Sequence, residues 1–183
     1  MTADEERHGS DAYLYNVWGK SFPAITGGAT RPVVDRRYPN PDSMFDSRAY
    51  PKGAFILHML RERIGEKPFF QGLRHYAESN RLKSVETSDL RRSLEAETGH
   101  DLEQFFHDWT ERPGNPVLEL VATTTDKALN LHLKQLQESE PFHFGLPIRI
   151  HFRELASGKN QFVESVLEVT TREHNYNIPR SEE

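Results

Sequence analysis

The chain has 183 residues, and its 28 acidic and 23 basic side chains give a formal net charge of −5, which argues against nucleic acid or an anionic membrane as a partner. No apolar run approaches the ~18 residues of a transmembrane helix, and the first ten residues are too polar for a signal peptide. The lack of cysteine excludes a disulfide framework, which is compatible with a cytoplasmic protein and equally with a periplasmic or secreted parent.

The N-terminal region is predicted to be helical. Residues 4–20 show helical spacing with a flaw at Gly9, and Phe22-Pro23 followed by Gly27-Gly28 is typical of a helix exit. Residues 29–49 are rich in proline, asparagine and aspartate, which favour turns. We therefore expect an ordered irregular segment between the first helix and the next.

Two further helices are predicted over residues 51–64 and 66–79. Pro51 suits the first helical position, and Gly65 suits the cap between the helices. The first helix is apolar almost all round, so we expect it to be buried. The second carries one apolar stripe and is expected to pack on the first as a hairpin; the stripe consists of Phe69, Phe70, Leu73, Tyr76 and Ala77.

A third helix is expected to begin near Thr87 or Ser88 and to end at Gly99. A fourth opens with Asp101 and Gln104, which are spaced like a capping box. Its apolar face predicts a packed core rather than a cofactor site, and it consists of Leu102, Phe105, Phe106 and Trp109.

Beyond residues 112–116 the apolar period changes from helical to alternating. We therefore expect a helical subdomain at residues 1–115 and an antiparallel β domain at residues 116–183. About four strands are predicted, fewer than a self-sufficient sandwich usually has, over residues 117–124, 129–134, 148–153 and 162–171. The predicted class is α+β with an incomplete β-sandwich, whose unpaired edge favours dimerisation or strand swapping.

Tyr50 is the strongest candidate for a functional residue. Pro51 biases the residue before it away from the helical region, so we expect Tyr50 to be extended just outside a rigid helix. A rigidly held phenol is a hydrogen-bond donor suited to a developing oxyanion. The residues alone are more often those of an ordinary, partly buried tyrosine.

Tyr50 lies within a series of short motifs that follow one another along the chain. Phe45-Asp46, Tyr50, Lys52-Gly53-Ala54, Leu57 and Met59-Leu60 fit the pattern FDxxxYxKGAxxLxML. Downstream come Arg61-x-x-x-Gly65, paired phenylalanines, the segment TSDLRRSLEAETGHDLEQFFHDW and the segment PGNPVLEL. Over roughly residues 31–121 the chain resembles the aminopeptidase N family of zinc peptidases, the gluzincin aminopeptidases.

The resemblance implies a role for Tyr50 and a missing metal site. In the family, the equivalent tyrosine binds the substrate carbonyl oxygen as zinc-bound water attacks. The family binds zinc through His-Glu-x-x-His and a later glutamate, but no two of the nine histidines here are four residues apart. We therefore expect the helical C-terminal part of a thermolysin-like catalytic domain and the start of the next domain, without the N-terminal zinc-binding half.

Such a piece is expected to hold no zinc and to be inactive alone. Its partners would then be the missing zinc-binding half and, in the intact parent, a peptide substrate. Whether the chain is itself an enzyme is left open by its sequence. The alternative is a noncatalytic scaffold or interaction module derived from the peptidase fold.

Other polar residues near Tyr50 have simpler explanations. Lys52 fits a solvated first-turn lysine, whereas Gly53 fits a close approach of the zinc helix or ordinary packing. Asp42 and Asp46 fit a substrate pocket or, more commonly, turns and caps. Further along the chain, Glu103 and His107 are spaced as a surface ion pair, which we favour over an acid and a base.

Overall fold

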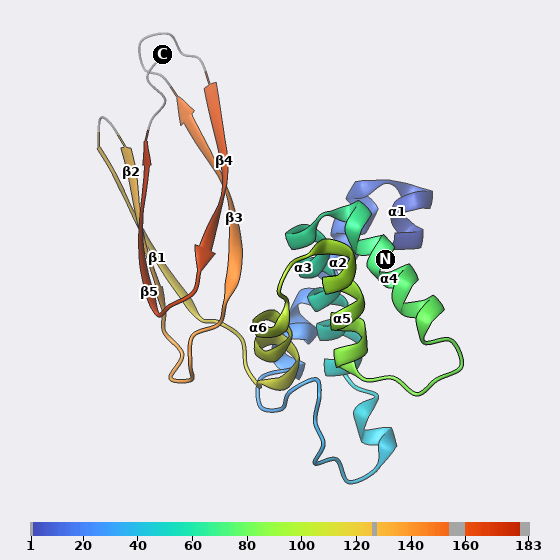
Figure 1. The fold of residues 1–183 in the computed structure, drawn as a ribbon. Coiled ribbons are helices and arrows are strands. Elements are labelled where there is room, and N and C mark those ends of the chain that lie inside the picture. The colour runs from blue at the N-terminus through green and yellow to red at the C-terminus, as the bar shows by residue number, and fades with distance from the viewer. Residues whose placement is uncertain (1, 126–127, 154–159, 180–183) are drawn as a thin grey trace. The chain divides into compact units, whose positions relative to one another are not determined.

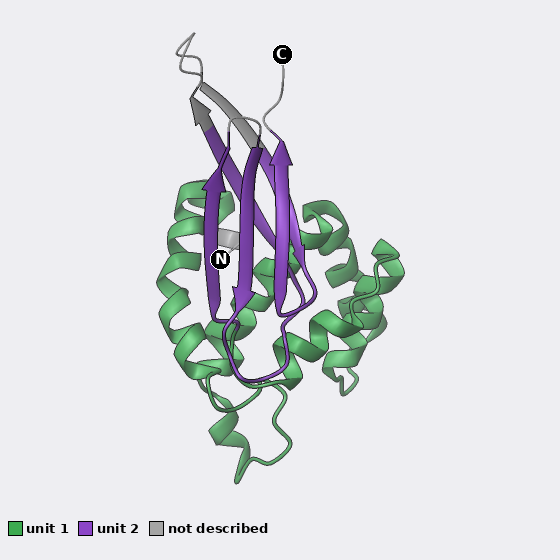
Figure 2. Ribbon diagram, turned by 90° about the vertical axis from the view of Figure 1, so that its left-hand side faces the viewer, with its two compact units in different colours: residues 1–115 green, residues 116–183 purple. Residues whose placement is uncertain are grey.

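The computed structural model describes residues 2–125, 128–153 and 160–179 (Figure 1). The chain divides into two compact units, Met1–Asn115 and Pro116–Glu183 (Figure 2). The described part of the first unit is helical, and that of the second consists of antiparallel strands. The predicted α+β class is therefore confirmed. Among the described helices, none combines the length and the apolar composition needed to cross a membrane.

The first unit opens with α1 (Thr2–His8) and α2 (Ser10–Gly27), which are separated at Gly9. Gly9 has a φ of 84°, which only glycine adopts readily, so the predicted flaw is a helix break. α2 continues through Phe22-Pro23 and ends at the predicted Gly27-Gly28. Proline removes one backbone hydrogen bond, but Ala24 is buried on the inner face and its packing supports the last turn.

An irregular segment leads from α2 to the next helix. It contains one short 3₁₀ helix, Pro41–Met44, at whose start the Asn40 side chain accepts a hydrogen bond from the Ser43 N–H at 3.0 Å. It ends in a π-helical turn, η2 (Arg48–Lys52), which continues into α3 (Gly53–Ile64).

Tyr50 lies inside this π-helical turn, so the prediction of an extended residue before the helix is wrong. The Tyr50 N–H donates to the Asp46 carbonyl at 3.2 Å, and the Lys52 N–H donates to the Ser47 carbonyl at 2.9 Å. The second bond spans five residues rather than four. Because the turn is wider than an α-helix, it accommodates Pro51, which has no N–H and would clash with the preceding α-helical turn.

The helices after η2 pack into a layered core. α3 buries Ile56, Leu60 and Ile64, whereas Leu57 on another face is exposed, so the predicted burial holds for part of its surface only. The predicted boundaries of α4 (Glu66–Ser79) and α5 (Thr87–Thr98) are confirmed. α4 contacts α3 but packs more extensively on α5.

The predicted fourth helix is α6 (Glu103–Phe106) followed by a π-helical turn, η3 (His107–Glu111). Its apolar face is confirmed as core, with Leu102, Phe105, Phe106 and Trp109 all buried. The predicted capping box is wrong. The Asp101 side chain instead accepts a hydrogen bond from the N–H of Glu103, the residue before Gln104, at 2.9 Å.

The second unit contains five described strands in two antiparallel sheets. One sheet has the order β1 (Leu118–Thr124), β2 (Ala128–Gln135), β5 (Glu173–Pro179), and the other pairs β3 (Phe144–Arg153) with β4 (Asn160–Val169). Leucines and isoleucines of both sheets form its core, including Leu129, Leu131, Leu167 and Ile178.

Strand β5 was not among the predicted strands. On its inner face this strand carries only Tyr176 and Ile178 as large apolar residues, between polar neighbours, so its alternation is short. The side chains of residues 152–163 lie outside the described part of the chain. The predicted alternation of apolar and polar side chains at Phe152, Arg153 and Phe162 therefore lies outside the described side chains.

Candidate functional site

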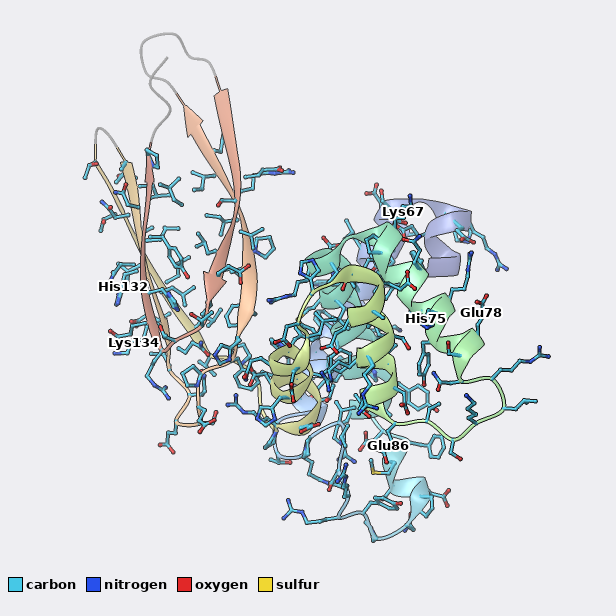
Figure 3. The ribbon with its side chains drawn as sticks, viewed as in Figure 1. Lys67, His75, Glu78, Glu86, His132 and Lys134 are labelled. Carbon is cyan, nitrogen blue, oxygen red and sulfur yellow. The ribbon has the colours of Figure 1, made fainter. Side chains whose placement is uncertain are left out.

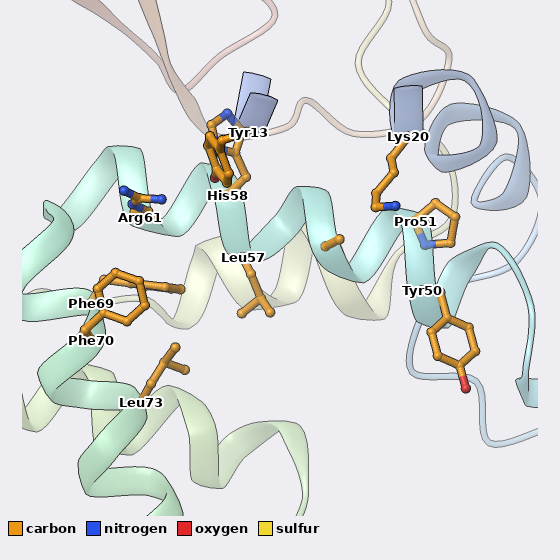
Figure 4. A pocket seen from close by; sticks show the side chains of 11 residues that line it. Tyr13, Lys20, Tyr50, Pro51, Leu57, His58, Arg61, Phe69, Phe70 and Leu73 are labelled. Carbon is orange, nitrogen blue, oxygen red and sulfur yellow. The ribbon is translucent and has the colours of Figure 1, made fainter. Parts of the chain in front are cut away.

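Tyr50 presents its phenol at the surface of the first unit. The side chain is 61% exposed, and its ring centroid lies 6.4 Å from that of Phe45, which is also exposed. In Figure 4 the hydroxyl points away from Tyr13 and His58, which lie at the other end of the groove that these residues line. The phenol is thus held on a helical turn but is open to a group outside the described chain.

A buried arginine holds the turn that carries Tyr50. The Arg48 Nε donates to Asp46 Oδ2 at 2.7 Å, and Arg48 Nη1 lies 3.4 Å from Asp35 Oδ2. Arg48 also donates to the carbonyl oxygens of Pro32 at 3.2 Å and Ser43 at 3.3 Å. One side chain therefore connects the irregular segment to η2 at several points. Sequence reasoning missed Arg48, because a surface arginine and a buried one have the same local pattern.

The two carboxylates beside Arg48 are both stabilised as anions. Burial alone would raise the pKa of Asp46, but hydrogen bonds from the Arg48 side chain and backbone hold that pKa below its ordinary value. The Arg37 N–H and the Arg31 side chain likewise lower the pKa of Asp35. Asp46 thus accepts a hydrogen bond from the backbone N–H of Arg48 in its own turn, as the interpretation of Asp46 as a turn residue predicts.

Lys52 is buried, so its predicted role as a solvated charge is wrong. Only 2% of the residue is exposed, and its Nζ donates to the carbonyl oxygen of Gly114 at 3.0 Å. Burial lowers the pKa of Lys52. A Cβ at Gly28 would overlap the Lys52 side chain, and the Gly114 N–H donates to the Gly28 carbonyl at 2.7 Å. The lysine therefore joins η2 to the end of α2 and to the segment that leaves the first unit.

Gly53, by contrast, makes no close approach. A Cβ at this position would meet only the Arg48 carbonyl oxygen, at 3.7 Å, which is ordinary contact. The structure therefore shows no packing within the described residues that requires glycine here. Asp42 lies in the 3₁₀ helix and its carbonyl accepts a hydrogen bond from the Phe45 N–H at 3.1 Å.

An open groove of about 420 Å³ runs beside α3 from Tyr50 toward α4 (Figure 4). Its polar part is a pair in which the Tyr13 hydroxyl lies 2.7 Å from His58 Nδ1. Burial lowers the pKa of His58 and raises that of Tyr13. The rest of the groove is mostly apolar, and its lining includes Pro51, Ala54, Leu57, Phe69, Phe70 and Leu73.

Arg61 closes one end of the groove. Its guanidinium lies 5.0 Å from the centroid of the Tyr13 ring and makes two hydrogen bonds to Glu5, at 2.7 and 3.2 Å. Hydrogen bonding to Glu5, with a further ion pair to Glu66 at 3.1 Å, raises the pKa of Arg61. Its charge is therefore already compensated. The sequence signal for this cluster was weak, since His58 and Arg61 are three residues apart on a helix and their partners lie on α1 and α2.

Glu103 and His107 do not form the predicted pair. His107 Nδ1 lies 3.4 Å from Glu111 Oε2, and Glu103 lies 3.9 Å from Arg91. The helix widens at His107, so its ring meets a residue of the following turn. Across the described residues, no three or more His, Cys, Asp or Glu side chains are grouped closely enough to hold a metal ion.

Comparison with known proteins agrees with the motif order. Residues 24–109 match the Peptidase family M1 domain. Aminopeptidase N of Lactococcus lactis subsp. lactis is 36% identical over 95 residues, which cover 51% of this chain and 11% of the relative. Leucyl aminopeptidase of Saccharolobus solfataricus is 30% identical over 112 residues, covering 60% of this chain and 14% of the relative.

A solved structure shows the same fold. Aminopeptidase A of Legionella pneumophila, crystallised in complex with aspartic acid, superposes with a TM-score of 0.75 at 24% sequence identity. The match covers 96% of this chain and 19% of that chain.

The matched model is that of a peptidase family, and the fold of this chain occurs in a solved aminopeptidase. The match of residues 24–109 to the Peptidase family M1 domain and the aminopeptidase relatives confirm the resemblance to the aminopeptidase N family. The family implies zinc chemistry. The chain spans only 11% and 14% of the length of the two relatives named above.

Proposed function

We propose that this chain supplies the oxyanion-stabilising tyrosine and one wall of the substrate cleft to a zinc-dependent aminopeptidase. The observation that supports this role is the exposed phenol of Tyr50 on a turn fixed by two buried cations, Arg48 and Lys52. A free surface tyrosine would not need such support. A catalytic donor does, because it must already be in place when charge develops.

The chemical task of the phenol is to donate a hydrogen bond. When a nucleophile adds to a peptide carbonyl, the carbonyl oxygen gains negative charge, and a donor near 2.7–3.1 Å from that oxygen lowers the barrier. Removing one such donor typically slows the reaction by about 10²- to 10³-fold. Tyr50 O–H would fill this role for a substrate lying at the open end of the groove.

The groove beside α3 is the proposed cleft wall. Its lining is largely apolar, and its charged end is occupied by the ion pairs of Arg61 with Glu5 and Glu66. A wall of this composition suits an apolar side chain of a peptide better than a charged one. Tyr50 and Lys20 stand at the other end, where the peptide backbone would pass.

The described residues do not fit a zinc site, so we derive no step through zinc from this chain. We propose that the metal is held by a polypeptide carrying the N-terminal zinc-binding part of the M1 domain, and that the present chain is inactive without it. Tyr50 then acts on a substrate bound between the two parts.

A two-component assay tests this proposal. The chain is mixed with the part of the L. lactis relative that precedes its similarity to this chain, in which we place the zinc site, and hydrolysis of an aminoacyl-anilide is followed. We expect no hydrolysis by either component alone, hydrolysis by the mixture, and loss of activity with a chelator. Hydrolysis by the isolated chain, or none by a mixture shown to associate, would contradict the proposal.

A second candidate function is a noncatalytic scaffold or interaction module derived from the peptidase fold. It is favoured by the lack of a grouped set of metal ligands among the described residues. The same assay separates the two, since a scaffold would associate with a partner without any turnover.

A further inference from the structure

The chain passes from one sheet of the second unit to the other at the corner between β4 and β5. β4 ends at Val169 in one sheet, and β5 begins at Glu173 in the other. Thr170 and Thr171 lie outside both ladders, so their N–H groups need another acceptor. One side chain supplies it, because His174 Nε2 lies 3.0 Å from the nitrogen of Thr170 and 2.9 Å from that of Thr171.

The Nε2 atom of His174 therefore carries no proton in the folded corner. A backbone N–H can only donate, so a ring nitrogen that faces two of them can only accept. In a neutral imidazole one nitrogen accepts and the other donates, which places the ring proton on Nδ1. The geometry thus defines both the charge and the tautomer of His174.

The hydroxyl of Thr171 does not change this assignment. Its oxygen lies 2.9 Å from His174 Nε2, and it donates to the carbonyl oxygen of Glu173 at 2.9 Å. A protonated Nε2 could use this hydroxyl as an acceptor, but the same proton would oppose the two N–H donors. Protonation therefore exchanges two backbone hydrogen bonds for one bond to a hydroxyl.

The corner connects several parts of the second unit. The His174 ring stacks on that of Tyr176, with 5.6 Å between the centroids, and the Tyr176 hydroxyl donates to the carbonyl oxygen of Glu168 on β4 at 2.7 Å. Gln135 at the end of β2 is fully buried, and its side-chain amide donates to the carbonyl oxygen of Thr171 at 3.1 Å. The position of these two threonines thus affects both sheets.

Charged groups of the neighbouring elements are engaged elsewhere. Arg172 donates to the carbonyl oxygens of the segment after β2, and Glu173 pairs with Lys134 at 2.8 Å. Within the described residues no carboxylate forms an ion pair with the His174 ring. No such contact therefore offsets the loss of the two N–H bonds. The other titratable groups on the elements that meet here are His132, Glu138, Glu140, His143, Glu168 and Tyr176.

We propose that His174 makes the corner between the two sheets sensitive to pH. Uptake of a proton at Nε2 releases the N–H groups of Thr170 and Thr171. Both threonines are exposed, so water accepts the released N–H groups and the corner opens locally while the rest of the unit stays folded. The folded corner binds the unprotonated ring, so its stability is greatest at alkaline pH and decreases as the pH falls through the range in which imidazoles change charge, about pH 8 to 5.

Nuclear magnetic resonance of the ¹⁵N-labelled full chain tests the proposal without any substitution. At about pH 8 we expect Nε2 of His174 at the chemical shift of an unprotonated ring nitrogen and Nδ1 at that of a protonated one. Amide exchange at Thr170 and Thr171, divided by the intrinsic rate at each pH, should accelerate at least about fivefold between pH 8 and pH 5. Fivefold is the factor that corresponds to one ordinary hydrogen bond.

Three variants separate the acceptor from the titrating group. His174→Gln offers an amide oxygen that does not titrate, so the corrected exchange rates should not depend on pH. His174→Leu removes the acceptor, so both amides should exchange rapidly at every pH. His132→Gln is the matched control, because it removes an imidazole of the same sheet that lies 3.9 Å from Glu173 and bonds neither threonine. It should respond to pH like the unchanged chain.

Each measurement has an outcome that overturns the proposal. A proton on Nε2 of His174 at pH 8 would show that the ring is not the acceptor. Corrected exchange rates that are equal at pH 8 and pH 5 would show that the corner does not respond. A full response in His174→Gln, or a lost response in His132→Gln, would assign the pH dependence to another group.

Discussion

The Nζ of Lys52 lies 3.0 Å from the carbonyl oxygen of Gly114, sixty-two positions later in the chain. This bond joins the π-helical turn that carries Tyr50 to the last residues of the first unit. A buried ammonium is costly to desolvate and is retained only where it is hydrogen-bonded. The position of Tyr50 therefore depends on a residue that does not itself touch the proposed substrate.

Replacing Lys52 with alanine should destabilise the first unit by about 2–4 kcal/mol, because the change leaves a cavity and removes the donor to Gly114. Lys52→Met keeps most of the packing and should have a smaller effect. Lys67→Ala, at an exposed lysine of α4 (Figure 3), is the control and should fall within about 0.5 kcal/mol of the unchanged chain. Urea unfolding measures all three, and equal effects at Lys52 and Lys67 would show that the bond is unimportant.

The contact of α4 with α5 requires a glycine at position 72. A Cβ there would lie 2.6 Å from Leu94 Cδ2 and 3.1 Å from Leu94 Cα. Gly72→Ala should therefore destabilise the chain by about 1–3 kcal/mol, despite the higher helix propensity of alanine. Gly19→Ala in α2, where a Cβ meets nothing within 4 Å, should instead stabilise by up to about 1 kcal/mol. We expect the thermal unfolding midpoint to fall in Gly72→Ala and to rise in Gly19→Ala. A shift of both midpoints in the same direction would contradict this expectation.

The Arg48 cluster predicts sensitivity to acid. The pKa values of Asp35 and Asp46 are lower in the folded chain than in the unfolded chain. As the pH falls below about 4, the unfolded chain takes up protons first, so stability present above pH 4 is lost progressively below it.

Asp46→Asn should reduce this loss of stability between pH 6 and pH 3, although it lowers stability at pH 6. Asp42→Asn, which is exposed and outside the Arg48 cluster, should leave the pH dependence unchanged. Urea midpoints at the two pH values test the difference. The same pH dependence in Asp46→Asn as in the unchanged chain would count against the cluster.

The edge strand β1 predicts self-association of the second unit. Among the described strands β1 pairs with β2 alone, and its apolar residues Leu118, Leu120 and Val121 are exposed. Glu119 is the one charged residue of β1; it lies opposite Lys134 of β2, which forms an ion pair with Glu173 of β5 at 2.8 Å. The rest of β1 therefore has no charge that would oppose pairing with another strand.

We expect the chain to form dimers through residues 117–171 at high concentration. Val121→Lys should shift the equilibrium toward the monomer, and Leu82→Lys, which adds the same charge outside the sheets, should not. Sedimentation at several concentrations is the measurement. A monomer at every concentration would show that the β1 edge does not mediate self-association.

The sequence predicted the elements whose signals are local. The boundaries of α4 and α5 follow from apolar stripes and from glycine caps at Gly65 and Gly99, all within a few residues. The errors arose where distant parts of the chain decide the outcome. The turn at Tyr50 is helical because the Arg48 cluster and Lys52 hold it, and the partners of these cations lie up to 62 positions away.

The candidate site shows the same division. Tyr50 was identified from motif order, which needs no structure. The side chains that hold the turn at Tyr50 were not identified from the sequence. The burial of Arg48 and Lys52 and the pairing of Tyr13 with His58 depend on which helices pack together. Trp18 and Phe22 of α2 are visible in the sequence as large aromatic residues, but only their exposed fractions show that the described chain leaves them uncovered.

The most direct test of the central proposal is the rate of the two-component mixture with Tyr50→Phe in place of the unchanged chain. The substitution removes one hydroxyl from an exposed ring, so zinc content and association should not change. We predict that kcat falls by about 10²- to 10³-fold, while Tyr38→Phe, at another exposed tyrosine, has no effect. An unchanged kcat in Tyr50→Phe would show that this phenol does not stabilise the oxyanion.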